Sequence, residues 1–134
     1  MEKPVAFDRV VIDSILTYAK MFHPREGILL LRGKKEKGRI LITDVQIPPL
    51  ANHGYTFSAF PMHMLPIDFT IMGTAHSHPS GILKPSRADL NNFYGRIMVI
   101  AAYPYRAERD IGVFDRSGNR IPYEILHMEE EDFW

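Results

Sequence analysis

The sequence predicts a single α/β (α+β) domain, residues 1–134, in which helices flank a mixed central β-sheet. The length of 134 residues suits one compact domain that buries a core without covalent crosslinks. A hydrophobic fraction of 46% and a charged fraction of 24% are typical of a globular protein. The predicted elements run helix, two strands, strand, helix, strand, two strands. This order favours a mixed sheet over a doubly wound parallel one.

A helix opens this order and extends from Asp8, its N-cap, to about Phe22. Apolar residues recur along it at helical spacing, and Pro24 favours a stop. The following run EGILLLRG is typical of a short strand buried on both faces. The segment GRILITDVQIP alternates in polarity and predicts a second strand that ends at Pro48–Pro49. We expect these two strands to pair across a loop over Gly33–Gly38.

The second half of the chain begins with a segment rich in proline, residues 49–66, which predicts mostly loop. FTIMGTAHSH predicts a strand, and a helix is expected from Ser86 to about Tyr94, between Pro85 and Gly95. RIMVIAAY predicts a buried strand. DIGVFD and RIPYEIL, joined by a Ser-Gly-Asn turn, predict a closing hairpin.

Charge and composition exclude several classes of function. The formal net charge is zero, so no overall field attracts nucleic acid or an anionic membrane. The chain has no cysteine, which excludes disulfides and thiolate sites. No basic-then-apolar leader and no bilayer-length apolar run is evident. We therefore expect a cytoplasmic protein that binds neither nucleic acid nor membrane.

The segment GTAHSHPSGILKPSRADL contains a candidate metal site. Residues i and i+2 of a strand share a face, so His76 and His78 present their imidazoles side by side, with Cβ atoms roughly 7 Å apart. Pro79 favours the end of the strand, and Ser86 as N-cap would place Asp89 in the first turn of the next helix. Two histidines and one carboxylate around an open fourth position are typical of catalytic zinc.

Each half of this pattern also has an ordinary structural interpretation. Paired histidines occur by chance on surfaces and in cores, and Ser-x-x-Asp is a common helix start. Both interpretations can hold together, because a capped first turn is a rigid place for a ligand. Ser77 should point away from the histidines, since side chains alternate along a strand. The remaining four histidines lack ligand spacing to a partner.

HSHPSGILKPSRAD matches H-x-H-P-x6-S-x2-D, the signature of the JAMM (MPN-type, MPN+) zinc metalloproteases, at every signature position. HPREGILLLRG resembles another block of that family, in which a glutamate opens a strand, and Glu26 occupies that place. AYPY looks like the compact archaeal, deubiquitinase-like members. The resemblance covers Val10 to about Pro122 and implies a cytidine-deaminase-like JAMM/MPN core.

The resemblance also implies a catalytic site. In the family, the residues matching His76, His78 and Asp89 bind one zinc ion per chain, with water as the fourth ligand. The matching Glu26 would be the general base and would return a proton to the departing amine. The matching Ser86 would help to stabilise the tetrahedral intermediate. The implied reaction cleaves the isopeptide bond between the C-terminal glycine of a ubiquitin-like modifier and a substrate lysine.

Contacts with partners are less well defined by the sequence. Tyr55, Phe57 and Phe60, in the loop-rich stretch 51–61, are candidates for an apolar platform that binds the modifier. Core packing is the alternative use for at least one of them. A homodimer is a further expectation, with Leu16 or the aromatic tail DFW as contacts.

Two alternative functions stay open at this point. Compact relatives trim a residue from the C-terminus of a small sulfur-carrier protein, and the same site residues would serve that reaction. Other MPN-type domains are non-catalytic modules that bind ubiquitin-like proteins or act as scaffolds, but they typically lack signature ligands. A nucleic-acid deaminase also uses zinc and a glutamate, but the absence of cysteine excludes it.

Overall fold

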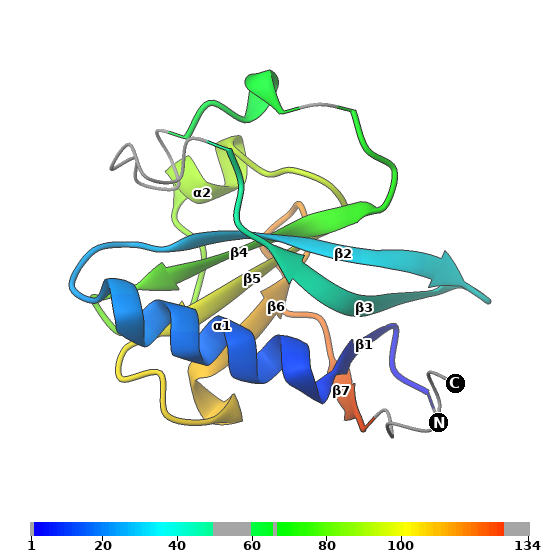
Figure 1. Ribbon diagram of the computed structural model, residues 1–134, viewed down its shortest axis with the longest axis horizontal. Coiled ribbons are helices and arrows are strands. Elements are labelled where there is room, and N and C mark those ends of the chain that lie inside the picture. The colour runs from blue at the N-terminus through cyan, green and yellow to red at the C-terminus, as the bar shows by residue number, and fades with distance from the viewer. Residues whose placement is uncertain (1, 50–59, 66, 128–134) are drawn as a thin grey trace.

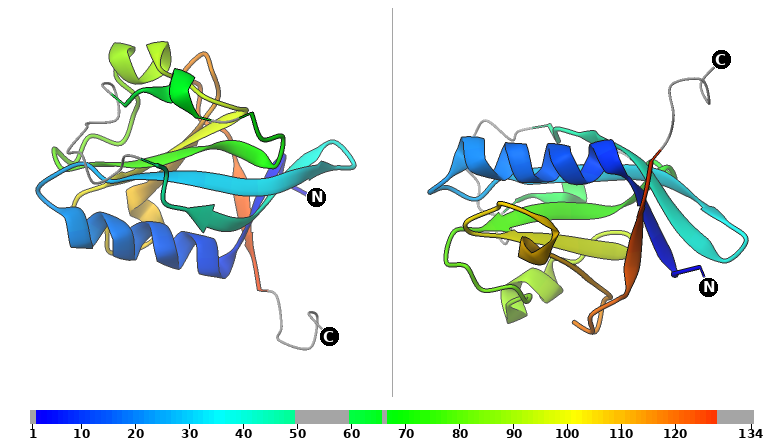
Figure 2. Two further views of the ribbon diagram at one scale, coloured as in Figure 1. Left: turned by 45° about the horizontal axis from the view of Figure 1, so that its top comes forward. Right: turned by 90° about the horizontal axis from the view of Figure 1, so that it is seen from below.

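The computed structural model describes residues 2–49, 60–65 and 67–127. A seven-stranded mixed sheet has the strand order β6-β5-β4-β2-β3-β1-β7. The longer helix α1 lies on one face of the sheet and the short helix α2 on the other (Figures 1 and 2). The expected mixed sheet with helices on both sides is confirmed. The helices and strands are β1 (Val5–Asp8), α1 (Arg9–Phe22), β2 (Ile28–Glu36), β3 (Arg39–Gln46), β4 (Ile71–His78), α2 (Arg87–Asn91), β5 (Ile97–Ala102), β6 (Ile111–Phe114) and β7 (Tyr123–Leu126).

Helix α1 forms where the apolar spacing predicts it. The Asp8 side chain caps its first turn and accepts a hydrogen bond from the Val10 amide at 3.1 Å. The last turn closes through the His23 amide, which donates to the Ala19 carbonyl at 3.1 Å. The buried stripe of α1 packs on β3, β1, β4 and β5, and consists of Val11, Ile12, Ile15, Leu16 and Ala19.

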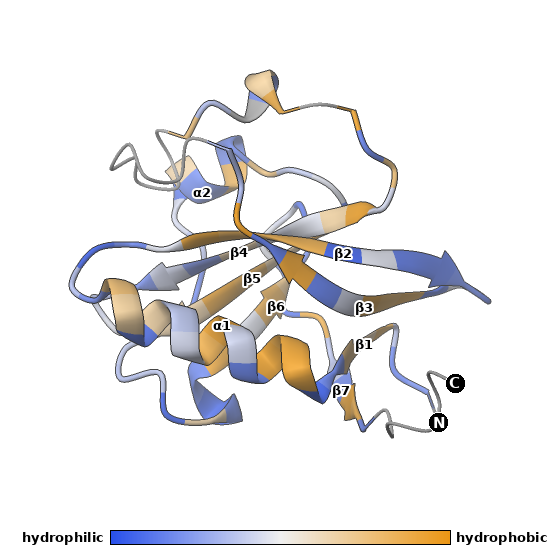
Figure 3. Cartoon of the chain, viewed as in Figure 1, coloured by the Kyte–Doolittle hydropathy of each residue, from blue (hydrophilic) through white to orange (hydrophobic). Residues whose placement is uncertain are grey.

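The hairpin β2–β3 is longer than the sequence suggests. Strand β2 continues through Gly33 to Glu36, and only Lys37 and Gly38, with φ of 53° and 79°, form the turn. The expected loop over Gly33–Gly38 is therefore wrong. The charged residues that suggested a loop lie on a strand pair that projects from the body, and Figure 3 shows this tip as hydrophilic.

The two ends of the chain pair in a way that local patterns did not predict. β1 was not expected, yet it pairs in parallel with both β3 and β7. The prediction of a closing hairpin is wrong, because its two strands do not pair with each other. Instead, β6 pairs with β5 at one edge of the sheet and β7 pairs with β1 at the other. Of the expected hairpin, the described residues form one isolated β-bridge, between Phe114 and Arg120. The second helix ends at Asn91, earlier than the expected Tyr94.

Hydrophobic residues are buried on both faces of the sheet. The larger cluster lies under α1 and includes Leu16, which is 7% exposed and therefore not available for self-association. The smaller cluster lies on the α2 face and contains Ile28, Phe60, Met98, Ile100 and Phe114. No helix in the described part of the chain has the length and apolar character of a membrane span.

Candidate metal centre

Strand β4 brings His76 and His78 to one face of the sheet. His76 is in register with Ile28 of β2 and with Ile100 of β5, and both belong to the cluster on the α2 face. His76 is buried at 2% exposure, while His78, at the end of the strand, is partly exposed. Ser77 between them is also buried and points to the α1 side, as strand alternation predicts.

Helix α2 supplies the carboxylate. A complete capping box starts it: the Ser86 hydroxyl accepts from the Asp89 amide at 3.0 Å, and the Asp89 carboxylate accepts from the Ser86 amide at 2.9 Å. Asp89 is 5% exposed. The reciprocal hydrogen bonds fix its side chain toward the end of β4, so the carboxylate that completes the cap also lies beside the two histidines.

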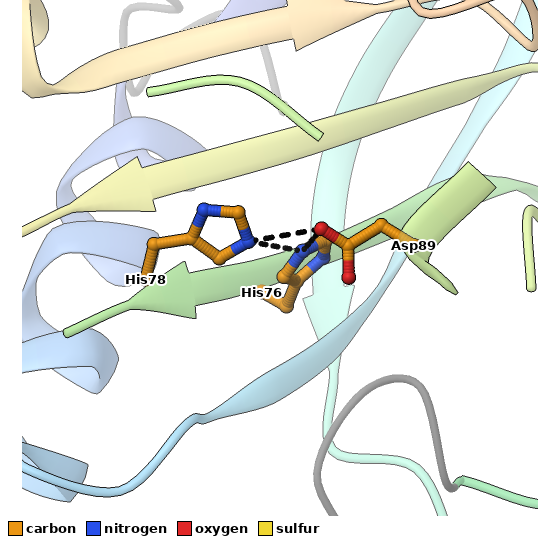
Figure 4. A group of neighbouring side chains, drawn as sticks. All are labelled: His76, His78 and Asp89. Atoms are coloured by element: carbon orange, nitrogen blue, oxygen red, sulfur yellow. Dashed lines mark hydrogen bonds and ion pairs between the residues drawn. The ribbon is translucent and has the colours of Figure 1, made fainter. Parts of the chain in front are cut away.

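The side chains of His76, His78 and Asp89 point toward one another (Figure 4). His78 Nε2 lies 3.1 Å from His76 Nε2 and 3.1 Å from Asp89 Oδ2. His76 Nε2 lies 3.5 Å from the same oxygen. A tetrahedral ion with bonds of about 2.0–2.1 Å separates its ligand atoms by about 3.3–3.4 Å. The three observed edges match one face of such a tetrahedron.

The protonation states of these groups suit a cation. His78 Nδ1 is 2.8 Å from the Ile82 carbonyl and donates to it, so once Nε2 has lost its proton the lone pair of that nitrogen faces the centre. Burial lowers the pKa of His76 despite the opposing effect of Asp89, so this ring is held neutral. Burial opposes ionisation of Asp89, but hydrogen bonds from the two histidines outweigh it and hold its pKa well below the usual range.

Glu26 lies beside this cluster, in the segment between α1 and β2. Because Ile28 is in register with His76 on antiparallel strands, continuing the pairing by two residues places Glu26 opposite His78. Burial lowers the pKa of His76 and the charge of Glu26 only opposes this, whereas at His78, whose pKa is raised despite burial, the charge of Glu26 adds to the larger effect of the hydrogen bond to Asp89. Glu26 is partly exposed, and the Ser86 side chain is exposed as well, so both are accessible to a substrate.

The candidate substrate platform has a different outcome. Phe60 is 3% exposed and packs in the smaller hydrophobic cluster, so it is not part of an exposed surface. Its neighbours there are large apolar side chains that exclude water, and core packing is the use that the structure gives it. Tyr55 and Phe57 lie outside the described residues.

Sequence reasoning missed one contact at this site. The Gly27 amide donates to the Ser77 hydroxyl at 2.8 Å, which joins the Glu26 segment to the residue between the two histidines. Strand alternation did predict that Ser77 points away from the histidines, but not which group its hydroxyl meets. The partner is distant in sequence, so no local pattern indicates it.

With this geometry in place, comparison with known proteins identifies the class. The chain belongs to the family of prokaryotic homologues of the JAB domain, which matches residues 8–113. A probable metalloprotease from Haloferax volcanii is 33% identical over 128 residues, covering 90% of this chain and 79% of that protein. The fold and the relatives define a JAMM/MPN metalloprotease.

Solved structures agree with this assignment. A JAB1/MPN domain protein from Archaeoglobus fulgidus is 26% identical with a TM-score of 0.65, covering 95% of this chain and 98% of the other. A structure described as a JAMM metalloprotease-like zinc site in the proteasome and signalosome is 28% identical with a TM-score of 0.65, covering 95% of this chain and 100% of the other. Together with the His-His-Asp cluster, these neighbours indicate that the centre binds a metal ion.

Proposed function

We propose that this protein is a zinc-dependent isopeptidase that cleaves the bond between the C-terminal glycine of a ubiquitin-like modifier and a substrate lysine. The observation that carries the proposal is the convergence of His76, His78 and Asp89 with ligand-atom separations of 3.1–3.5 Å. Two imidazoles and one carboxylate form the three-ligand set of catalytic zinc, and a structural zinc would call for four protein ligands.

The residues around the cluster divide the chemistry between them. One zinc ion per chain, held by His76, His78 and Asp89, would supply a Lewis acid that makes water nucleophilic near neutral pH. The Glu26 carboxylate takes a proton from the attacking water and delivers it to the lysine nitrogen as that amine leaves. The Ser86 hydroxyl donates a hydrogen bond to the oxygen of the attacked glycine carbonyl as negative charge develops on it.

The Ser86 role is compatible with its place in the helix cap. Its oxygen accepts from the Asp89 amide, and a hydroxyl has one proton of its own to donate elsewhere. No serine or cysteine nucleophile is required, so the reaction proceeds without an acyl-enzyme. A Gly-Gly modifier tail suits the site because it brings no side chain against the buried His76.

The path of the modifier tail is limited by the sheet. β4 is bordered by β2 and β5, and the edges of the described sheet are β6 and β7. Strand addition directly beside the histidines therefore has no free edge within the described residues. We propose that the tail instead runs over the α2 face, past the end of β4, and that cytoplasmic lysine conjugates of the modifier are the partners.

The test uses zinc-loaded protein and a lysine-isopeptide conjugate of a ubiquitin-like protein that ends in Gly-Gly. Intact masses are recorded over time for the wild type, Glu26→Gln and Glu36→Gln. Glu36 is an exposed carboxylate on the hairpin and serves as the matched control. We expect release of the modifier with a free Gly-Gly end, retained in Glu36→Gln and lost in Glu26→Gln at equal zinc content.

Two other outcomes would redirect the assignment. Zinc binding without release of the modifier would exclude isopeptide cleavage, and the same site would then be tested on a sulfur-carrier protein with a C-terminal extension. Failure to bind zinc at all would favour a non-catalytic module that binds ubiquitin-like proteins.

A further inference from the structure

Glu26 lies outside every described helix and strand, so its position depends on other contacts. α1 ends at Phe22 and β2 begins at Ile28, and Glu26 belongs to the short segment between them. A group that transfers protons has to be held within hydrogen-bond reach of the reacting atoms. A displacement of about 1 Å can lower a rate by about a hundredfold.

Ser77 holds the residue that follows Glu26. The Gly27 amide donates to Ser77 Oγ at 2.8 Å, and the Ser77 amide donates to the Gly27 carbonyl at 3.2 Å. In a regular antiparallel pair the first of these bonds would go to a main-chain carbonyl. Here a side-chain oxygen takes its place at the last pair, where the chain leaves the sheet. Both residues are buried, so water does not compete for these bonds.

The Gly27 amide belongs to the peptide bond that joins Glu26 to Gly27. Fixing this amide fixes the plane of that peptide, which contains the Cα atom from which the Glu26 side chain leaves the backbone. Ser77 lies between the two histidines in sequence, with its side chain on the opposite face of β4. One strand therefore presents two ligands on one face and a hydroxyl that orients the Glu26 segment on the other.

The start of the segment is held separately. The His23 ring shares a hydrogen bond of 3.0 Å with the Tyr105 hydroxyl and stacks on Tyr103 with 4.7 Å between ring centroids. Tyr105 is 1% exposed and gives a rigid support. These contacts locate the segment as a whole, whereas the Ser77 hydroxyl acts at the peptide that carries Glu26.

We propose that Ser77 is a positioning residue for Glu26, acting through the hydrogen bond from the Gly27 amide to its hydroxyl. The proposal rests on the proposed function for the role of Glu26, but the hydrogen bond itself is measurable without any reaction. The Ser77 side chain lies on the α1 face of β4, opposite the face that carries the histidine rings. Its removal should therefore lower kcat without weakening the binding of metal or substrate.

The variants are Ser77→Ala, which removes the acceptor, and Ser77→Thr, which keeps it. Thr74→Val is the matched control, because Thr74 is fully buried on the same strand and its hydroxyl has no hydrogen-bond partner among the described residues. We expect Ser77→Ala to lower kcat on the isopeptide conjugate by 10- to 100-fold, on the order of the effect of about 1 Å of misplacement. KM and zinc affinity should change by less than about threefold, and Ser77→Thr should restore kcat to within about threefold of the wild type.

Hydrogen exchange of the Gly27 amide, followed by nuclear magnetic resonance, tests the contact independently of activity. The amide should be protected in the wild type, Ser77→Thr and Thr74→Val, and should exchange at least tenfold faster in Ser77→Ala. Ser77→Cys, which has a weaker acceptor of similar size, gives the same comparison if Ser77→Ala does not fold.

Several results would overturn the proposal. Rapid exchange of the Gly27 amide in the wild type would remove the hydrogen bond on which it depends. Wild-type kcat in Ser77→Ala, or an equal loss in Thr74→Val, would leave Ser77 without a specific role. A loss of zinc in Ser77→Ala would make it a support for the ligands instead. A wild-type protein that releases no modifier would contradict the proposed function, while the exchange data would still decide whether Ser77 holds the Glu26 peptide.

Discussion

Ser86 has one observed role and one proposed role, and a set of substitutions can separate them. Its hydroxyl accepts from the Asp89 amide at 3.0 Å as the cap of α2, and it is also the proposed donor to the developing oxyanion. Its main-chain amide, by contrast, holds Asp89 Oδ2 at 2.9 Å whatever side chain is present. Substitutions at Ser86 should therefore leave the orientation of Asp89, and with it zinc affinity, nearly unchanged.

The magnitudes differ between the two roles. Losing the cap to alanine costs about 0.5–2 kcal/mol of stability, whereas glycine at an N-cap costs only a few tenths, roughly 0.3 kcal/mol. Losing an oxyanion donor costs about 10- to 1,000-fold in kcat, whichever residue without a hydroxyl replaces the serine. Ser86→Gly should thus be slow but nearly as stable as the wild type. Ser86→Ala should be both slow and less stable, and Ser86→Thr should retain both functions.

The assay combines turnover of the isopeptide conjugate, urea denaturation and zinc competition with a chelator. A Ser86→Gly variant that keeps zinc and turns over at the wild-type rate would refute the oxyanion role. A Ser86→Gly variant that loses zinc would show that the side chain supports Asp89 after all. If Ser86→Thr were as slow as Ser86→Ala, the hydroxyl would not be the group that matters.

Two further predictions concern the sheet and the metal centre. Gly73→Ala should lower the free energy of unfolding by about 3 kcal/mol, because a Cβ there would lie 2.0 Å from the Ile97 carbonyl oxygen of β5. Gly38→Asn in the open hairpin turn should change it by less than about 1 kcal/mol in the same denaturation experiment. Zinc affinity should fall by about tenfold for each unit by which the pH is lowered, across the pH range in which histidines ordinarily titrate. Although burial opposes it, the hydrogen bond that His78 donates to Asp89 raises the pKa of His78, so a proton must leave this ring before it binds the metal. His76 and Asp89 have lowered pKa values and release no proton in this pH range. Chelator competition at several pH values would contradict this if the slope were zero or two.

The parts of the site that the sequence predicted follow from short-range rules. Strand alternation places His76 and His78 on one face, and the capping box places Asp89 on the first turn of α2. Spacing did not show that this turn faces the end of β4, which the resemblance to the JAMM family implied. Glu26 was different, because a single acid before an apolar run has no distinctive pattern. Its place was indicated by resemblance to the JAMM family, and the antiparallel pairing of β2 with β4 accounts for it physically.

The errors in topology concern pairing between distant segments. The turn at Ser117–Asn119 is present: Asp115 accepts from both ends of it, and Gly118 has φ of 85°. A turn signal nevertheless does not determine where its flanking strands pair. β7 pairs with β1, which lies more than a hundred residues earlier in the sequence. The four residues of β1 are all buried and are too few to show the alternation of apolar and polar residues that indicates a strand.

The interior position of β4 explains how one short segment can serve several functions at once. β5 fixes β4 through six consecutive residue pairs, from Gly73 to His78, and β2 pairs with it on the other side. Because side chains alternate with a period of two, a slip by one residue would turn both histidines toward α1 and Ser77 toward Asp89. The ligands and the proposed support for Glu26 would then be lost together. The register that buries the core thus also assembles the metal centre, and the site needs no rearrangement of β4 to receive a metal ion.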